Sequence, residues 1–370
     1  MKLFVVLPRL DGGGLERVML YLLPEFRDAG IDVSLVVGQL RGELVPLIPR
    51  GIPIVEIAPS SPYRFFDGLI RAILRHRPTH ILSAADDVNI MALLANRITR
   101  NRARVVVTNH NTLSEQLSRA RRACHLKLIM TRSLMRTLYP WADGVVAVSS
   151  GVADDLAQQL HLARGGIEAI FNPVVDSGFE ARMMEPPPEL WPHSPDPVIL
   201  YTGRLAPQKR PDLLLEAFAH VLQRQAAFLA IAGTGPERSR IEGEVVRRGW
   251  QERVKLFGFI PNVLPLMRAA DVFALASDYE GMGNVIVEAL ACGTPVVSTD
   301  CPSGPAEILE GGRWGRLVPT NDPVALGQAL LATLNDPAPI PTELLVRRAS
   351  FFSARRAAQS YLRILTSREE

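Results

Sequence analysis

Short apolar runs alternate with longer amphipathic segments through the first half of the chain. The amphipathic segments repeat with a helical period and predict helices at Glu16–Ala29, Phe66–His76 and Val152–His161. Strands that alternate with helices are typical of a parallel sheet covered on both faces. The apolar runs predict the buried strands of that sheet at Leu3–Leu7, Val33–Val37, Ile54–Ile57, His80–Leu82, Arg104–Thr108 and Gly144–Val148.

Proline interrupts this alternation in the middle of the chain. Six prolines lie within Asp176–Pro197, and we expect no regular element at that density. The alternation then restarts. Strands are predicted at Val198–Thr202, Phe228–Ala232, Val254–Phe257, Val272–Ala276 and Thr294–Ser298, and helices at Pro211–Gln225, Pro236–Arg248, Val263–Ala270, Val285–Ala291 and Val324–Leu334.

These patterns predict an α/β protein built from two doubly wound domains. We expect an N-terminal domain at 1–178, a proline-rich linker at 179–197 and a C-terminal domain at 198–351. The amphipathic stretch Phe352–Leu365, within 352–370, is expected to pack back on the first domain. Open α/β sheets bind ligands at the carboxyl ends of their strands, so two such domains would create a cleft suited to a two-part reaction.

Composition narrows the class of protein. Hydrophobic residues make up 47% and charged residues 21%, as is usual for a globular chain. Cys124, Cys292 and Cys301 show no CxxC spacing, which favours a reducing compartment over a disulfide framework or a zinc site. Leu3–Leu7 is too short for a signal peptide, and no apolar run approaches the roughly 18 residues of a spanning helix. We therefore expect a cytoplasmic protein, with membrane contact at most peripheral on the cytoplasmic face of the inner membrane.

Basic residues are concentrated in one stretch although the net charge is only +3. Arg97–Arg136 contains ten Lys and Arg residues, and Glu115 is its single acidic residue. Such a stretch attracts anionic lipid headgroups at about 1 kcal/mol per basic residue near the surface. It contains no Phe, Tyr or Trp, on which bases of a single strand would stack, so we do not expect a nucleic-acid partner. A solvated helix face is the simpler alternative.

A glycine-rich turn follows the first predicted strand. Gly12, Gly13 and Gly14 let the backbone approach a ligand closely, and the following helix offers free N–H groups to an anion. The dinucleotide spacing G-x-G-x-x-G fails because Arg17 occupies its last position. A tight structural turn is the alternative interpretation.

Two further motifs follow strands of the second domain. Arg204 and Lys209 lie in a loop after the first strand and suit a diphosphate, through bidentate contacts and a point charge; a solvated pair of cations is the alternative. Glu280 and Glu288 lie eight residues apart, and Gly281–Asn284 between them offers backbone N–H groups at a helix start. Glu288 is costly in an otherwise apolar helix unless it is bound, and a ribose diol is a suitable partner.

At this point the sequence resembles a known family. Glu280-x7-Glu288, followed by the A-C-G-T-P-V-V run Ala291–Val297, resembles the E-x7-E signature of the retaining GT-B glycosyltransferases of family 4. Gly203–Lys209 resembles the diphosphate loop of that family, and Gly12–Arg17 resembles its G-G-x-E-R loop. Ala232–Pro236 and Cys301–Ile308 resemble further family segments, and the second of these is similar to bacterial members that build lipopolysaccharide or other lipid-linked glycans.

The resemblance implies a fold and an activity. The fold would be GT-B, with two Rossmann-like domains facing across a cleft. The enzyme would transfer a hexose-type sugar from a nucleotide-diphosphate donor, most commonly a UDP-sugar, to a glycan or glycolipid acceptor in lipopolysaccharide, O-antigen or exopolysaccharide biosynthesis. A sugar-nucleotide epimerase and a non-catalytic nucleotide-sugar or glycan-binding protein on the same fold are the alternatives.

The resemblance also implies residue roles. His110 follows the strand Arg104–Thr108, where a family histidine contacts the donor sugar near the reacting carbon; from the residues alone, a structural histidine is an equal alternative. Asn172, in an N-P-V segment, is interpreted as structural. The implied catalytic residues are His110, Arg204, Lys209 and Glu280. The implied donor-binding residues are Gly13, Gly14, Gly203, Arg204, Lys209, Gly258, Phe259, Ile260, Glu280, Gly281, Met282, Gly283, Asn284, Val285 and Glu288, with Gly258–Ile260 beside the base.

The mechanism implied by the family is retention by front-face attack, with the donor phosphate taking the acceptor proton. No carboxylate pair is placed as nucleophile and acid for a double displacement. No D-x-D metal motif is visible, so cationic side chains are expected to replace a metal, and no cofactor is expected.

Overall fold

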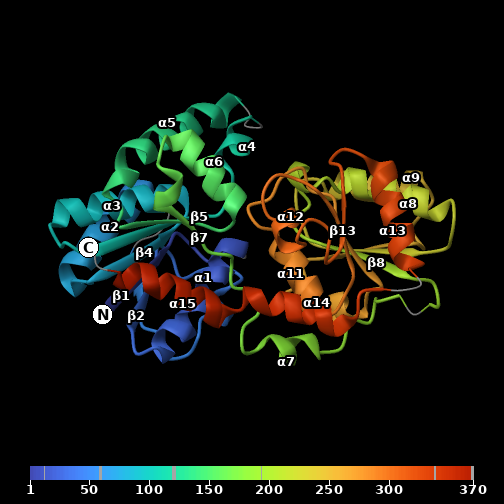
Figure 1. Ribbon diagram of the computed structural model, residues 1–370, viewed down its shortest axis with the longest axis horizontal. Coiled ribbons are helices and arrows are strands. Elements are labelled where there is room, and N and C mark those ends of the chain that lie inside the picture. The colour runs from blue at the N-terminus through green and yellow to red at the C-terminus, as the bar shows by residue number, and fades with distance from the viewer. Residues whose placement is uncertain (12, 58–60, 119–121, 193, 337–338, 368–370) are drawn as a thin grey trace. The chain divides into compact units, whose positions relative to one another are not determined.

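The chain divides into two compact units. The structure is a computed structural model that describes all residues except 12, 58–60, 119–121, 193, 337–338 and 368–370, and the side chains of residues 122 and 123 are also not described. Unit 1 comprises Met1–Asp176 together with Phe352–Glu370, and unit 2 comprises Ser177–Phe351 (Figure 1).

Unit 1 is built on a parallel sheet. In its described residues the sheet has seven strands in the order β3-β2-β1-β4-β5-β6-β7. The strands are β1 Lys2–Leu7, β2 Asp32–Val37, β3 Ile54–Glu56, β4 His80–Ala84, β5 Arg104–Asn109, β6 Gly144–Ala147 and β7 Ile167–Ala169. The helices are α1 Gly14–Asp28, α2 Pro62–His76, α3 Asp86–Thr99, α4 Leu113–Ser118, α5 Arg122–Leu138, α6 Ser150–Leu160 and α15 Ala354–Thr366, with short 3-10 turns at Val45–Leu47, Tyr139–Trp141 and Arg164–Gly166.

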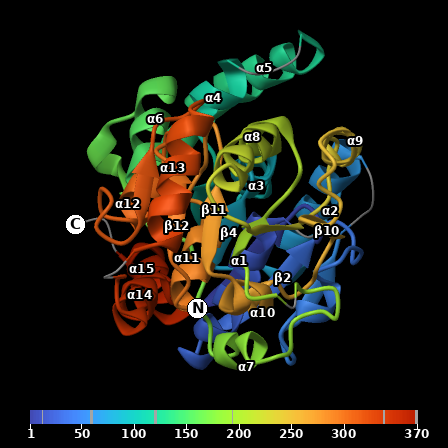
Figure 2. The ribbon, with the colours of Figure 1, turned by 90° about the vertical axis from the view of Figure 1, so that its right-hand side faces the viewer.

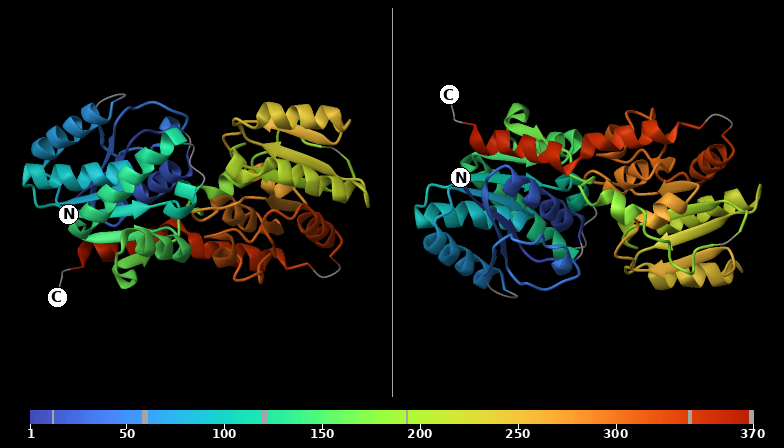
Figure 3. Two further views of the ribbon diagram at one scale, coloured as in Figure 1. Left: turned by 90° about the horizontal axis from the view of Figure 1, so that it is seen from above. Right: turned by 90° about the horizontal axis from the view of Figure 1, so that it is seen from below.

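Both faces of this sheet are covered, which explains why its central strands are continuously apolar. Every residue from Leu3 to Leu7 in β1 is fully buried. Leu3, Val5 and Leu7 point into one core, which they share with Phe26 of α1 and with the C-terminal helix α15. Helix α15, the red helix next to the label C in Figure 3, is therefore an integral part of unit 1, although it follows the whole of unit 2 in the sequence.

Unit 2 repeats the same architecture. Its described residues form six parallel strands in the order β10-β9-β8-β11-β12-β13. Helices α8 and α13 lie side by side over this sheet (Figure 2). The strands are β8 Val198–Thr202, β9 Phe228–Ala232, β10 Val254–Gly258, β11 Val272–Leu275, β12 Val296–Thr299 and β13 Arg316–Val318. The helices are α7 Phe179–Met183, α8 Pro211–Leu222, α9 Arg238–Arg247, α10 Leu264–Ala269, α11 Asn284–Ala291, α12 Pro305–Ile308, α13 Pro323–Leu334 and α14 Thr342–Ala349, with 3-10 turns at Pro207–Lys209 and Ser350–Phe352.

The predicted α/β class is confirmed, and each predicted strand and helix is present with small shifts at its ends. The expectation of no regular element in Asp176–Pro197 was wrong, because α7 forms at Phe179–Met183. The first proline of that stretch is Pro186, so α7 ends before any proline can interrupt it. Several elements were not predicted, namely α3, α4, α5, α12, α14, β7 and β13.

Backbone contacts between glycines hold together the loops after β8, β9 and β10. Gly203 N–H donates to the carbonyl of Ala232 at 3.0 Å, and Gly233 N–H donates to the carbonyl of Gly258 at 2.7 Å. Gly233 has a φ of +150°, and a Cβ there would lie 1.8 Å from the carbonyl oxygen of Gly203. The close approach of these loops therefore requires glycine at position 233.

We predict that Gly233→Ala lowers the free energy of unfolding by about 2 kcal/mol or more, because the added methyl group has to push two loops apart. The matched control is Gly243→Ala in α9, where a Cβ has no neighbour within 4 Å. That change should stabilise by up to about 1 kcal/mol because alanine favours a helix. Urea unfolding of both variants measures the difference, and equal stabilities would refute the tight contact.

Candidate functional site

The sheet order of unit 2 defines where a ligand would bind. β8 lies between β9 and β11, so the connections leave it in opposite directions and β8–β11 is the topological switch point. Ligands of open α/β sheets bind at the carboxyl ends of the strands at such a point. The loops that leave these two strands carry Arg204 and Lys209, after β8, and Glu280, after β11. The sheet therefore brings together two motifs that are about 70 residues apart in the sequence.

Lys209 and Glu280 form an ion pair. The Lys209 Nζ donates to Glu280 Oε1 at 2.5 Å, and the Ser277 hydroxyl donates to the same oxygen at 2.6 Å. Glu280 is only 5% exposed, so its charge needs this compensation. Among the described residues, Glu280 Oε2 has no hydrogen-bond partner. The carboxylate is thus held in place by one oxygen and can accept a hydroxyl with the other.

The Arg204 side chain differs from that of Lys209 because it has no ion-pair partner among the described residues. Arg204 is exposed. Its backbone is fixed, because the hydroxyl of buried Tyr201 donates to the Arg204 carbonyl at 3.2 Å. Burial, and next the charge of Glu280, raise the pKa of Tyr201, so this hydroxyl stays protonated as a donor. Arg204 therefore presents an exposed guanidinium from a fixed backbone position, and a guanidinium suits a bidentate anionic ligand.

The Glu280–Glu288 segment folds as a tight loop followed by α11. Gly281, Met282 and Gly283 are buried, and Gly283 precedes the helix with a φ of +88°. α11 begins at Asn284, so the positive end of its dipole points to this loop. Glu288 is half-buried one turn into the helix, as are Asn284 and Val285 at its start.

A third loop supports this segment, and sequence reasoning did not place it in the site. Glu280 N–H donates to the carbonyl of Pro302 at 3.2 Å, in the loop after β12. A Cβ on Gly304 would lie 1.9 Å from the carbonyl oxygen of Met282, so the two loops are in direct contact. The Gly304-Pro305 pair after a buried strand was the signal that could have identified this contact.

The residues predicted to border the base lie at the edge of the sheet. Gly258 ends β10, which is two strands away from β8, and Phe259 follows with 43% of its surface exposed. Hydrogen bonds link Gly258 to the Gly203 loop by way of Gly233 and Ala232. The assignment of Gly258, Phe259 and Ile260 to the base stays a prediction.

In unit 1 the switch point lies between β1 and β4, because β1 is flanked by β2 and β4. The glycine-rich turn follows β1: Gly13 is the N-cap of α1 and Gly14 its first residue, whereas Gly12 lies outside the described residues. Glu16 in the first turn of α1 is half-buried, and this burial raises the pKa of its carboxyl.

His110 follows β5, the next strand of the same sheet, and its tautomer can be deduced. Thr108 Oγ1 donates its single proton to the carbonyl of Ser83 at 3.0 Å, so it has to accept from His110 Nε2 at 3.1 Å. Nδ1 then carries a lone pair, and this buried atom has no partner among the described residues. Burial lowers the pKa of His110 to about 3. His110 is therefore a neutral hydrogen-bond acceptor that is unsatisfied in the chain itself.

A buried polar network supports β5, and its members were not predicted as site residues. Asn109 Nδ2 donates to Asp86 Oδ1 at 2.9 Å, and the Tyr139 hydroxyl donates to Asn109 Oδ1 at 3.2 Å. Asn89 Nδ2 donates to the Tyr139 hydroxyl at 2.9 Å. Burial and the charge of Asp87 raise the pKa of Asp86 to about 6. The adjacent carboxylates after β4 were the signal in the sequence for this network.

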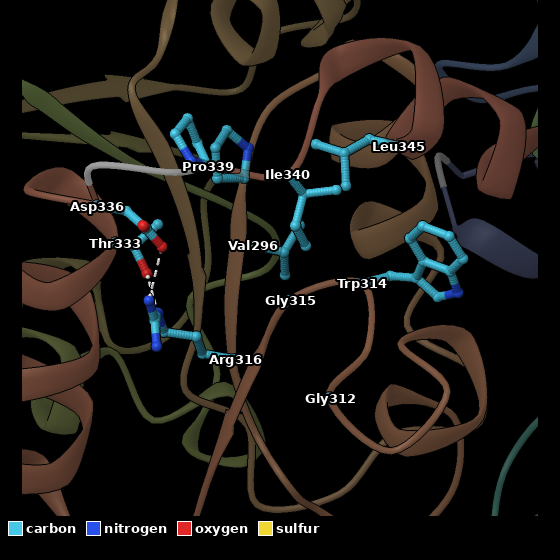
Figure 4. Close-up of a pocket in the computed structure, with 11 residues that line it drawn as sticks. Val296, Gly312, Trp314, Gly315, Arg316, Thr333, Asp336, Pro339, Ile340 and Leu345 are labelled. Atoms are coloured by element: carbon cyan, nitrogen blue, oxygen red, sulfur yellow. Dashed lines mark hydrogen bonds and ion pairs between the residues drawn. The ribbon is translucent and has the colours of Figure 1, made fainter.

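One further pocket lies at the opposite edge of the unit 2 sheet, beside the amino ends of β12 and β13. It has a volume of about 210 Å³ and is lined by Val296, Trp314 and Ile340 (Figure 4). Arg316 at its wall donates to Thr333 and Asp336 at 3.0 and 2.8 Å. None of the predicted site residues lines this pocket, so it is separate from the switch-point loops.

Two further features of the described residues concern metal binding and membrane crossing. Within the described residues, no group of three or more His, Cys, Asp or Glu side chains could hold a metal ion. In the same part of the chain, no helix has both the length and the apolar character to cross a membrane.

The loops at the switch points indicate the class of protein. A doubly wound sheet whose switch-point loops carry cations and a buried carboxylate, as in unit 2, is typical of α/β proteins that bind anionic nucleotides. Residues 12–177 match the family model described as Glycosyltransferase Family 4, and residues 196–336 match the model described as Glycosyl transferases group 1. The chain belongs to these glycosyltransferases, and the resemblance found in the sequence is confirmed.

Two curated relatives from Campylobacter jejuni act on lipid-linked glycans by name. N-acetylgalactosamine-N,N'-diacetylbacillosaminyl-diphospho-undecaprenol 4-alpha-N-acetylgalactosaminyltransferase is 29% identical over 67% of this chain and 65% of its own length, so the match spans less than two thirds of that relative. GalNAc-alpha-(1->4)-GalNAc-alpha-(1->3)-diNAcBac-PP-undecaprenol alpha-1,4-N-acetyl-D-galactosaminyltransferase is 25% identical over 91% of this chain and 89% of its own length.

A solved structure shares the fold. Anabaena Alr3699/HepE in complex with UDP and glucose superimposes with a TM-score of 0.79 at 20% identity, and the match covers 100% of both chains. This likeness confirms the predicted GT-B fold. It does not extend to the ligands of that protein.

We predict that His110 makes the stability of the protein depend on pH. Its pKa is lowered in the folded state, so between pH 6.5 and about 3 the unfolded chain binds the extra proton and stability is lost as the pH falls. Between pH 7 and pH 5, the free energy of unfolding should fall by about 2 kcal/mol more in the wild type than in His110→Asn. Denaturant unfolding at both pH values measures this. The control His161→Asn, at an exposed position, should behave as the wild type, and an equal loss in His110→Asn would contradict the buried neutral histidine.

Proposed function

We propose that the protein is a retaining glycosyltransferase that moves a sugar from a nucleotide-diphosphate donor, a UDP-sugar, to a lipid-linked glycan. The observation that carries the proposal is the pairing of Lys209 with buried Glu280 at the switch point of unit 2. Arg204, in the same loop as Lys209, has no ion-pair partner in the part of the chain that the structure describes. A cation that is fixed before the ligand arrives, next to a carboxylate with a free oxygen, suits a ligand that is a diphosphate at one end and a sugar at the other.

In this proposal different residues of unit 2 bind different parts of the donor. Arg204 and Lys209 bind the diphosphate and stabilise the charge that develops on the leaving group. Glu280 accepts hydroxyl hydrogen bonds from the sugar through its free oxygen, and the loop Gly281–Asn284 lies beside the phosphate. Glu288 accepts the two hydroxyls of the ribose. Retention follows from attack on the face that the diphosphate leaves, with a phosphate oxygen taking the acceptor proton.

His110 is proposed to contact the donor sugar. Its Nδ1 lone pair accepts a sugar hydroxyl, which would satisfy the buried atom that has no partner among the described residues. Because burial holds the imidazole in its neutral form, it cannot act as a proton donor to the leaving group near neutral pH. His110 therefore acts by orienting the sugar, and Gly13 and Gly14 give the backbone of unit 1 room beside the diphosphate.

The acceptor proposal rests on the relatives and on helix α5. Both Campylobacter jejuni relatives carry undecaprenol-linked substrates in their names. Leu126, Met130 and Leu134 recur every four residues on α5 and are exposed by 66%, 58% and 46%. Exposed basic residues accompany this stripe, including Lys127 and Arg136. An exposed apolar stripe with cations beside it suits the interface of an anionic membrane, where a lipid-linked acceptor would be found.

We predict that the wild type binds UDP, with Glu288 reading the ribose. UDP should bind at least about tenfold more tightly than 2′,3′-dideoxy-UDP, because the diol makes two hydrogen bonds to a carboxylate. Glu288→Ala should bind the two ligands equally. Isothermal titration calorimetry measures both affinities, with GDP and ADP as comparison ligands.

The outcomes separate the alternatives. The proposal is supported if the enzyme transfers a sugar from a UDP-sugar to an undecaprenyl-diphosphate glycan and NMR shows that the product keeps the α-configuration of the donor. UDP binding without any transfer would favour a non-catalytic nucleotide-sugar-binding protein. No binding of any nucleoside diphosphate would refute the donor assignment.

We also predict that α5 binds anionic membranes. Replacing both Leu126 and Met130 by Gln should reduce binding to vesicles of phosphatidylglycerol by about tenfold. The reason is that two apolar side chains would no longer insert into the membrane interface. Leu74→Gln is the matched control, because Leu74 is 55% exposed on α2 outside the basic stretch. Arg121 and Arg122 also belong to the basic stretch Arg97–Arg136, but their side chains lie outside the described residues. Vesicle flotation that is unchanged in the double variant would refute the role of α5.

A further inference from the structure

Arg210 has an unusual backbone for a residue with a side chain. It follows Lys209 directly and is the N-cap of α8, with φ and ψ of +46° and +52°. Non-glycine residues seldom adopt this left-handed conformation, and a side chain is kept there only when its contacts hold it. Its pKa is raised, first by the hydrogen bond to Asp212, so the guanidinium is a permanent cation.

The Arg210 side chain joins three loops at the carboxyl edge of the unit 2 sheet. Its Nε donates to Asp212 Oδ1 at 3.1 Å in the first turn of α8. Its Nη1 donates to Asp278 Oδ1 at 3.1 Å in the loop after β11, and also to Asn321 Oδ1 after β13. Asp278 is 8% exposed and Arg210 23% exposed, so the contact is largely shielded from water and not a surface ion pair.

This contact lies beside the Lys209–Glu280 pair and runs parallel to it. Lys209 and Arg210 are neighbours in one loop, and Asp278 and Glu280 are two residues apart in the other. Two further hydrogen bonds fix the same register: Asp278 N–H donates to the Gln208 carbonyl at 2.9 Å, and the Gln208 side-chain Nε2 donates to the Tyr279 carbonyl at 2.7 Å. The two loops are thus joined by two charged contacts, one backbone–backbone hydrogen bond and one side chain–backbone hydrogen bond.

We infer that Arg210 is a positioning residue for donor binding. It holds the loop of Lys209 against the loop of Glu280 before any donor is present, so that Arg204, Lys209 and Glu280 have their binding geometry in the free enzyme. Arg210 acts through these residues and does not itself contact the donor. We call the contacts of Arg210 with Asp212, Asp278 and Asn321 the Arg210 clamp. The effect of the clamp on donor binding rests on the proposed function. Its effect on the two loops can be tested in the ligand-free protein.

Arg210→Gly is the informative variant, because glycine tolerates the left-handed backbone while the guanidinium is removed. The matched control is Arg240→Ala. Arg240 also pairs with Asp212, at 3.5 Å, but its other ion pair is to Glu237, and it is 59% exposed. Both variants remove an arginine from Asp212, and only the first cuts the contact to Asp278.

The first measurement is hydrogen exchange in the ligand-free protein. We expect amide exchange of 276–283 to become about tenfold faster in Arg210→Gly and to stay at the wild-type rate in Arg240→Ala. An unchanged amide exchange rate of 276–283 in Arg210→Gly would refute the clamp, independently of whether the protein binds nucleotides.

The second measurement is donor kinetics with the UDP-sugar that the wild type uses. Arg210→Gly should raise the donor KM about tenfold and change the acceptor KM less than twofold. Arg210→Lys, which can reach one carboxylate but cannot bridge to Asn321, should be intermediate. Asp278→Asn should raise the donor KM similarly, and the double variant Arg210→Gly with Asp278→Asn no further, because both changes remove one contact.

The two failures are distinguishable. Faster exchange with an unchanged donor KM would show a clamp without a role in binding and would overturn the inference. An equal rise of the donor and acceptor KM values would show a general structural defect and would also overturn it. A wild type that binds no nucleoside diphosphate refutes the proposed function instead, while the exchange result still decides the clamp.

Discussion

The loops of unit 2 depend on one physical requirement, which is that the buried carboxylate of Glu280 be compensated. An ionised carboxylate that loses its partner in a protein interior costs about 3–5 kcal/mol. Lys209 and Ser277 provide the compensation at 2.5 and 2.6 Å. Because Lys209 follows β8 and Glu280 follows β11, this pair forms only if the two strands are neighbours in the sheet. The order β9-β8-β11 is therefore the condition for the site, and the site in turn ties the edge of the sheet together.

The charges at this edge are nearly balanced before a ligand binds. Lys209 and Arg210 are matched by carboxylates, whereas Arg204 has no ion pair within the described residues. Arg204 is therefore the cation that the proposed diphosphate could meet without displacing an existing ion-pair partner. Lys209 has three N–H donors and gives one to Glu280, so it could contact a phosphate while the pair stays intact. Under the proposed function, donor binding would add to the existing network without breaking it.

Sequence reasoning succeeded where the determining interactions are local. The strands β8 and β9 were predicted to the residue because they are buried on both faces and bounded by turn residues. The motif residues were found because a loop and the first turn of a helix are contiguous in the sequence. Helix α3 was missed because Asn89 interrupts its apolar pattern, and this polar side chain is buried only because Thr108 and Tyr139 satisfy it from distant elements.

The partners of the site residues could not be predicted for the same reason. Lys209 was expected to contact the diphosphate and Glu280 the sugar, but nothing in either motif indicates that they bind each other across 71 residues. Arg210 was not singled out, because its role depends on Asp278 and on Asn321, which is 111 residues away. The support from Pro302 and Gly304 is likewise a property of neighbouring strands. The sequence identifies candidate side chains, and the sheet order decides which of them are in contact.

The two switch points present different kinds of side chain, permanently charged in unit 2 and a neutral histidine in unit 1, and the pKa of His110 explains the difference. Unit 2 presents permanent charges, which suit a diphosphate at any physiological pH. Unit 1 presents a histidine whose burial lowers its pKa to about 3, so that it stays uncharged. A protonated histidine would be a further cation and would attract phosphate, and it would lose the lone pair on Nδ1. Because Thr108 fixes the proton on Nε2, the neutral ring can only accept at Nδ1, and its natural partner is a hydroxyl. A neutral acceptor of this kind favours a hydroxyl over a phosphate, which agrees with the sugar contact proposed for His110.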